Sequence, residues 1–151
     1  MDKNKKPIIV SIIPARGGSK GIINKNIREI CNKPLIAYSI EASNKASLVD
    51  YTFVSTENSE IAEIAKRYGA EIINRPIELS EDHVPDLPVL KHAIEYLEIK
   101  GIFPDILVWL RPPNLFRSCS DINNTIQKML DTNADTVRTV HLVKESPYWM
   151  Q

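Results

Sequence analysis

Short apolar runs alternate with stretches of helical periodicity along the chain. The runs are rich in Ile, Val and other apolar residues, which is typical of strands buried on both faces of a sheet. They fall at residues 8–13, 51–55, 70–73, 105–110 and 135–143. Each run therefore predicts a strand.

Four helices are predicted between these runs, because apolar residues recur there every three or four positions. They cover approximately residues 34–45, 56–68, 85–100 and 118–130. The second and third are expected to end at Gly69 and Gly101, since glycine readily adopts the left-handed conformation that closes a helix.

Polar residues at the helix starts predict their caps. Thr56 is placed to cap the second helix, with Glu57 and Glu60 in its first turn, where carboxylates favour the helix dipole. Ser118 and Asp121 have the spacing of a capping pair for the last helix.

Strands separated by helices predict an α/β fold. Crossover connections make neighbouring strands parallel and place helices on both faces of the sheet. We expect a single domain over residues 1–151, with an open, three-layer, Rossmann-like and mainly parallel sheet. Ligands of such sheets bind at the carboxyl ends of the strands.

The loop after the first strand, residues 14–26, combines glycines with three cations. Glycine lets backbone N–H groups approach an anion closely, and Arg16, Lys20 and Lys25 add positive charge. The loop therefore predicts a phosphate site. Its order Ser-Lys-Gly does not fit a P-loop, and a solvated surface turn is the plain alternative.

Further cations follow other predicted strands. Arg75 comes after the third strand, and Arg111 and Arg117 come after the fourth. Taken singly, each is a typical surface charge. Because parallel strands end at one edge, we expect several of them to face one crevice, as a nucleoside triphosphate requires.

Composition narrows the partners and the location. Nineteen basic and nineteen acidic residues give a formal net charge of zero, which argues against nucleic acid or an anionic membrane as the main partner. The sequence shows neither a membrane-length apolar run nor a signal peptide, which predicts a cytoplasmic protein. Cys31 and Cys119 lack the spacing of a zinc site. We interpret His83 as a surface group rather than as a catalytic base.

Several motifs in order resemble the CMP-acylneuraminate synthetases, the sialic-acid cytidylyltransferases. The first is Pro-Ala-Arg-Gly-Gly-Ser-Lys-Gly at residues 14–21, followed by Asn-Lys-Asn at 24–26 and Lys-Pro-Leu-Ile-Ala-Tyr-Ser-Ile at 33–40. Similar segments follow at residues 54–56, 75–79, 110–117 and 146–150. The resemblance covers essentially the whole chain.

This resemblance implies a sheet of the nucleotide-diphospho-sugar transferase type and a cytidylyltransferase reaction. The anomeric hydroxyl of an acylneuraminate-type, nine-carbon 2-keto-3-deoxy sugar acid would attack the α-phosphorus of CTP, giving CMP-sugar and pyrophosphate with Mg²⁺ as cofactor. Lys25 and Arg16 would be catalytic, with Lys25 nearest the α-phosphate. CTP binding would fall to Ala15, Arg16, Gly17, Ser19, Lys20, Lys25, Asn26, Arg75 and Asp82, and sugar binding to Arg111 and Arg117.

The chain departs from the family pattern at two places and in length. Asp86 stands where a hydroxyl is common, and an ionised carboxylate only accepts hydrogen bonds. Arg111 aligns with a frequent glutamine and would suit an acidic sugar, including legionaminic-type acids.

Family members are longer, which implies that this chain stops before a dimerisation arm and a carboxyl-terminal sugar- and metal-binding part. No metal ligand is therefore assigned here, and the full-length form is expected to be a homodimer. A 3-deoxy-manno-octulosonate cytidylyltransferase and a catalytically incomplete nucleotide-binding fragment remain the alternatives.

Overall fold

A four-stranded parallel sheet forms the centre of the protein. The computed structural model describes residues 6–18 and 21–140. The sheet has the order β5-β4-β1-β6, and all its pairings are parallel. Its strands are β1 (Ile9–Pro14), β4 (Tyr51–Thr56), β5 (Glu71–Asn74) and β6 (Ile106–Trp109).

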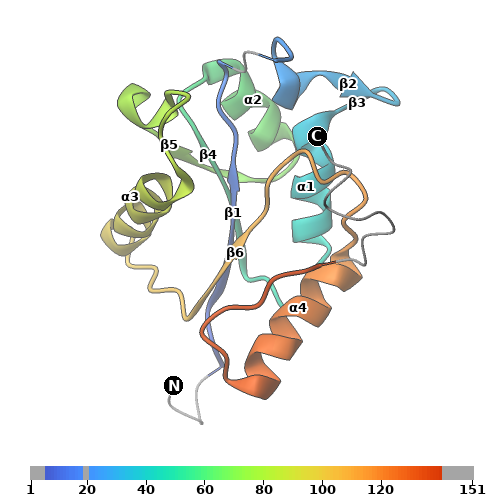
Figure 1. Cartoon of the computed structure of the whole chain (residues 1–151), viewed down its shortest axis with the longest axis vertical. Coiled ribbons are helices and arrows are strands. Elements are labelled where there is room, and N and C mark those ends of the chain that lie inside the picture. The colour runs from blue at the N-terminus through green and yellow to red at the C-terminus, as the bar shows by residue number, and fades with distance from the viewer. Residues whose placement is uncertain (1–5, 19–20, 141–151) are drawn as a thin grey trace, which may run out of the picture.

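Helices cover both faces of this sheet. Figure 1 shows α3 on one side of the strands and α1 and α4 on the other. The helices are α1 (Leu35–Asn44), α2 (Ser59–Arg67), α3 (Asp86–Ile99) and α4 (Cys119–Thr132). Small elements that the sequence did not predict are the 3-10 helices η1 (Lys25–Ile27) and η2 (Ile77–Ser80) and the antiparallel pair β2 (Glu29–Ile30) and β3 (Lys33–Pro34).

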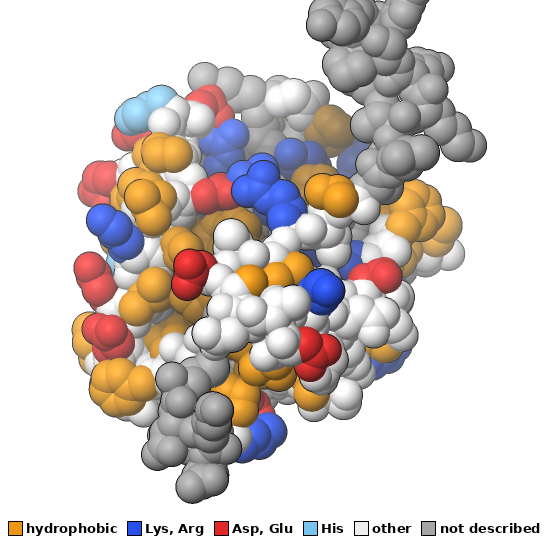
Figure 2. All heavy atoms as spheres, turned by 60° about the horizontal axis from the view of Figure 1, so that its bottom comes forward, with side chains coloured by type: hydrophobic (Ala, Val, Ile, Leu, Met, Phe, Trp, Pro, Cys, Tyr) orange, Lys and Arg blue, Asp and Glu red, His pale blue; other side chains and the backbone are white. Residues whose placement is uncertain are grey.

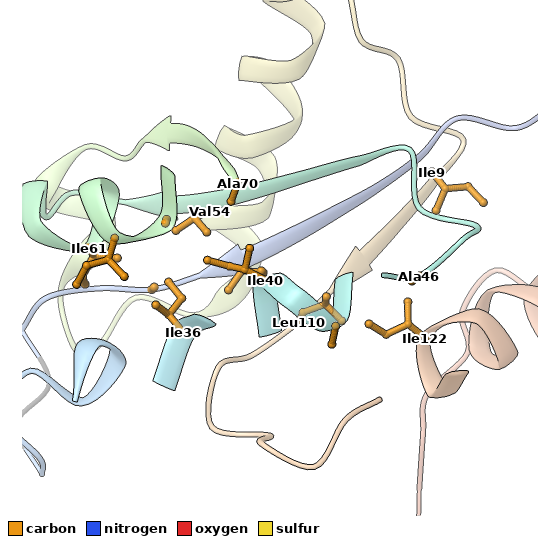
Figure 3. Close-up of a cluster of buried hydrophobic side chains, with 14 of the residues drawn as sticks. Ile9, Ile36, Ile40, Ala46, Val54, Ile61, Ala70, Leu110 and Ile122 are labelled. Atoms are coloured by element: carbon orange, nitrogen blue, oxygen red, sulfur yellow. The ribbon is translucent and has the colours of Figure 1, made fainter. Parts of the chain in front are cut away.

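Alternate residues of the central strand β1 supply the two halves of the core. Ile9 and Ile13 pack in a cluster with side chains of α1, α2 and α4, part of which Figure 3 shows. Val10 and Ile12 point the other way, into a smaller cluster with α3. All four side chains are buried, so β1 is apolar on both faces, as its sequence predicted. The α/β fold with a mainly parallel sheet is confirmed.

The order of the strands positions a binding site. The chain runs outward from β1 to β4 and β5, and then crosses back to place β6 on the free side of β1. In open α/β sheets, ligands bind beside the carboxyl ends of the strands where the order reverses in this way. The loops after β1 and β6 therefore flank the expected site.

The helix ends were predicted well, but one cap was wrong. Gly69 and Gly101 adopt positive φ angles of 85° and 75° just beyond α2 and α3, and Ser118 and Asp121 form a capping box. Thr56, however, is the last residue of β4, and Asn58 caps α2 by accepting a hydrogen bond of 3.0 Å from the Ile61 N–H. The strand pairing of Thr56 with Asn74 excludes it from the cap.

The last predicted strand was also wrong. Residues 135–140 form no strand, and residues 141–143 lie outside the described part of the chain. Asn133 ends α4 in the left-handed conformation, and most of residues 135–140 are exposed, so they lack the buried face that a strand needs. Among the helices that the structure describes, none has the length and apolar character to cross a membrane.

Candidate functional site

The carboxyl ends of the strands surround a cavity of about 260 Å³, called here the strand-end cavity. Its charged lining consists of Arg16, Lys25, Arg75 and Arg111 with Glu81, Asp82 and Asp86. A neighbouring hollow of about 310 Å³ shares Arg16, Glu81 and Asp82 with it. The predicted convergence of cations on one crevice is therefore confirmed for four of the residues. Figure 2 shows one face of the molecule, on which several Lys and Arg side chains lie near one another among hydrophobic and acidic side chains.

Arg16 is held at both ends. Its Nη1 atom lies 2.5 Å from the Asp82 carboxylate and donates to the Ser80 carbonyl oxygen at 3.3 Å. Its own carbonyl oxygen accepts a hydrogen bond of 2.9 Å from the buried Asn26 side chain. Asp82 and Asn26, both predicted as CTP ligands, thus also fix the position of Arg16.

Lys25 is the first residue of η1, and it lines the strand-end cavity. Asn24 takes a left-handed conformation with φ 53°, and its carbonyl oxygen accepts the Ile27 N–H at 3.0 Å. Asparagine tolerates this conformation better than most residues. The turn thereby returns the loop to the sheet edge and presents Lys25 to the same cavity as Arg16.

Glu57 connects three loops at this edge, a role that the sequence did not predict. Its carboxylate accepts hydrogen bonds from the Gly17 N–H at 2.7 Å and the Ser80 hydroxyl at 2.9 Å. It also pairs with Arg75 at 3.0 Å, where the two side chains are only 15% and 4% exposed. One carboxylate therefore joins the loops after β1, β4 and β5.

Electrostatics favours the charged form of Glu57. Burial raises the pKa of Glu57, but hydrogen bonds from the Gly17 backbone and from Ser80 and Arg75 lower it, and the net pKa lies below the usual glutamate value. Burial lowers the pKa of Arg75 below the usual arginine value, and Glu57 opposes that shift only in part. The positive charge of Arg16 also lowers the pKa of Arg75, so Glu57 offsets repulsion between two arginines.

The expected cradle of backbone N–H groups is partly occupied by the protein itself. The Gly17 N–H binds Glu57, and the N–H of the buried Ala15 donates to the Ser55 carbonyl oxygen at 3.0 Å. A Cβ atom on Gly17 would lie 2.6 Å from the Asn58 amide nitrogen. Gly17 thus permits close packing of the loop against Asn58.

The two predicted sugar-binding arginines differ in position. Arg111 lines the strand-end cavity, where its guanidinium contacts Asp86. Arg117 lines neither cavity and donates to the Arg111 carbonyl oxygen at 3.3 Å, so it supports the loop after β6. Ser19 and Lys20, also predicted as CTP ligands, lie outside the described residues.

Two of the three carboxylates that line the cavity are paired with arginines. Asp82 and Asp86 are engaged by Arg16 and Arg111, respectively. In the described part of the chain, no group of three or more His, Cys, Asp or Glu side chains is arranged to hold a metal. Mg²⁺ usually keeps several waters and binds through one or two carboxylates together with substrate phosphates.

Comparisons of sequence identify relatives over nearly the whole chain. The family described as Cytidylyltransferase matches residues 10–146. N-acylneuraminate cytidylyltransferase of Escherichia coli O18:K1:H7 is 36% identical over 79% of this chain and 27% of its own length. The CMP-N,N'-diacetyllegionaminic acid synthase of Legionella pneumophila is 33% identical over 93% of this chain and 61% of its own. The chain thus spans less than two thirds of these relatives.

Comparison of structures supports the fold. The structure of CMP:2-keto-3-deoxy-manno-octonic acid synthetase complexed with CTP matches with a TM-score of 0.67 and 23% identity, over 84% of this chain and 49% of the other. A 4-diphosphocytidyl-2C-methyl-D-erythritol synthase matches with a TM-score of 0.65 and 12% identity, over 85% and 56%. At these sequence identities, the structural likeness supports the Rossmann-like fold alone.

Proposed function

This chain belongs to the cytidylyltransferase family, and from that premise we propose that it binds CTP in the strand-end cavity. In the proposed reaction an acylneuraminate-type sugar acid is activated with CTP to give CMP-sugar and pyrophosphate. We propose that Mg²⁺ binds together with the triphosphate. We also propose that a protein extended to the length of the relatives forms a homodimer.

The observation that supports this proposal best is the gathering of four cations from three loops around one cavity. Arg16 and Lys25 follow β1, Arg75 follows β5 and Arg111 follows β6. Arginine offers a planar fork to phosphate oxygens, and lysine offers a compact charge. We propose that these cations supply positive charge to a bound triphosphate, which would compete with Asp82 and Asp86 for Arg16 and Arg111.

Lys25 and Arg16 receive different roles in the proposed reaction. The sugar hydroxyl oxygen forms a bond to the α-phosphorus, its proton passes to solvent, and the bond from that phosphorus to the bridging oxygen of pyrophosphate breaks. Negative charge grows on the phosphate oxygens as this occurs. Arg16, fixed by Asp82 and Asn26, would hold the triphosphate, and Lys25 would stabilise the growing charge.

The sugar is proposed as a nine-carbon 2-keto-3-deoxy acid. Relatives at 33–36% identity are named for N-acylneuraminate and N,N'-diacetyllegionaminic acid, and the cationic Arg111 at the cavity suits an acidic substrate. These relatives favour a nine-carbon acid over the octulosonate alternative.

A pyrophosphate-release assay tests the activity. The chain, and the same chain extended to the length of its relatives, would be given CTP, Mg²⁺ and a panel of sialic, legionaminic, pseudaminic and octulosonic acids. We expect release with a nine-carbon acid by the extended chain. Release with the octulosonic acid alone would contradict the sugar assignment, and no release with any acid would contradict catalysis.

A further inference from the structure

Asp86 and Arg111, the two departures from the family pattern, contact each other. Arg111 lies two residues after Trp109, the last residue of β6, and Asp86 is the first residue of α3. One oxygen of Asp86 accepts hydrogen bonds from Nε of Arg111 at 3.1 Å and from its Nη2. The same oxygen accepts the indole N–H of Trp109 at 3.1 Å.

This contact is exposed and lines the strand-end cavity. The Arg111 and Asp86 side chains are 65% and 49% exposed, and both face the cavity that Arg16 and Lys25 also line. Exposed ion pairs contribute little to the free energy of unfolding. The pair can therefore open at small cost, unlike the buried pair of Glu57 and Arg75.

An arginine fork is well matched to a carboxylate, and here an internal carboxylate already occupies it. A substrate carboxylate could take the place of Asp86 and leave the guanidinium charge compensated. A neutral sugar would instead have to break the pair without replacing the lost charge, so the pair would discriminate in favour of acids.

We propose that Asp86 is a specificity-determining residue, whose carboxylate holds Arg111 at the strand-end cavity and is exchanged for the carboxylate of the incoming sugar acid. The inference rests on the proposed function, because it assumes that the acid reaches the CTP-loaded cavity. Trp109 would report the exchange, since its N–H loses an acceptor when Asp86 is displaced.

The exchange can be followed by tryptophan emission. The chain has two tryptophans, so a Trp149→Phe variant keeps Trp109 as its single tryptophan. This variant, saturated with CTP, would be titrated with N-acetylneuraminic acid and, separately, with its methyl ester, which lacks the carboxylate charge. We expect the emission to change with the acid and not with the ester. An equal response to both compounds would overturn the proposal.

Calorimetry on Asp86→Asn then measures the competition. Removing the internal carboxylate should tighten binding of N-acetylneuraminic acid about two- to fivefold, which corresponds to the coupling of an exposed pair. The gain should vanish in Asp86→Asn/Arg111→Gln, because Asp86 acts through Arg111. Asp131→Asn, which removes an exposed charge on α4, is the matched control and should not change binding.

The outcomes separate this inference from the proposed function. Binding of CTP without binding of the acid, or an Asp86→Asn affinity equal to that of the parent chain, would overturn the exchange and leave the nucleotide site standing. Failure to bind CTP, measured first by calorimetry, would contradict the proposed function itself.

Discussion

Replacement of Glu57 with alanine is expected to lower the free energy of unfolding by about 3 kcal/mol, because it leaves the buried charge of Arg75 without its partner. For a chain of this length that corresponds to a fall in Tm of roughly 10 °C. CTP affinity should fall as well, since Gly17, Arg75 and Ser80 lose their common acceptor. Thermal unfolding and calorimetric titration measure the two effects.

Glu63→Ala is the matched control, because Glu63 is exposed on α2, the helix that begins two residues after Glu57. Its effect should stay within about 0.5 kcal/mol. An equal Tm for the Glu57→Ala and Glu63→Ala variants would contradict the role of Glu57 as the junction of three loops.

The pH dependence gives a second check on Glu57. Its pKa is lowered in the folded protein, so its charged form contributes stability above the unfolded glutamate value of about 4.3. That contribution is lost as the pH falls through the lower folded pKa. The difference in Tm between the parent chain and Glu57→Gln should therefore be constant near neutral pH and shrink in acid. A difference that grows in acid would contradict this assignment.

Replacement of Lys25 with alanine is expected to lower kcat about 100-fold, as loss of one charge that stabilises a transition state typically does. CTP affinity should fall much less, because Arg16, Arg75 and Arg111 remain at the cavity. The measurement is steady-state pyrophosphate release by the chain extended to the length of its relatives, with calorimetry for CTP binding.

Lys128→Ala, which removes an exposed lysine from α4, is the control and should leave kcat unchanged. Lys25→Arg keeps the charge and should recover part of the rate. An unchanged kcat in Lys25→Ala, or a loss confined to CTP affinity, would show that Lys25 does not act on the reacting phosphate.

Sequence reasoning succeeded where a local pattern determines the structure. The apolar run at β1 is buried on both faces, the glycines after α2 and α3 close those helices, and the Ser118 and Asp121 pair forms the predicted cap. The parallel direction of the strands then brought Arg16, Arg75 and Arg111 to one edge of the sheet.

The failures arose where contacts between distant residues decide the outcome. Glu57 looked like an ordinary first-turn carboxylate of a helix, but β4 extends to Thr56, and this extension turns Glu57 toward Gly17 and Arg75. A clue was available, because Glu57 directly follows a strand just as Arg75 does. The contact between Asp86 and Arg111 joins residues that are 25 positions apart, and no spacing rule predicts it.

Calorimetric titration with CTP and with ATP, carried out on the parent chain and on Arg16→Ala, tests the central claim most directly. We expect CTP to bind more tightly than ATP, and we expect the Arg16→Ala change to weaken CTP binding, because Arg16 lines the strand-end cavity and is fixed there by Asp82 and Asn26. Equal affinity for the two nucleotides, or CTP binding that is unaffected by loss of Arg16, would contradict a cytidine nucleotide site in this cavity.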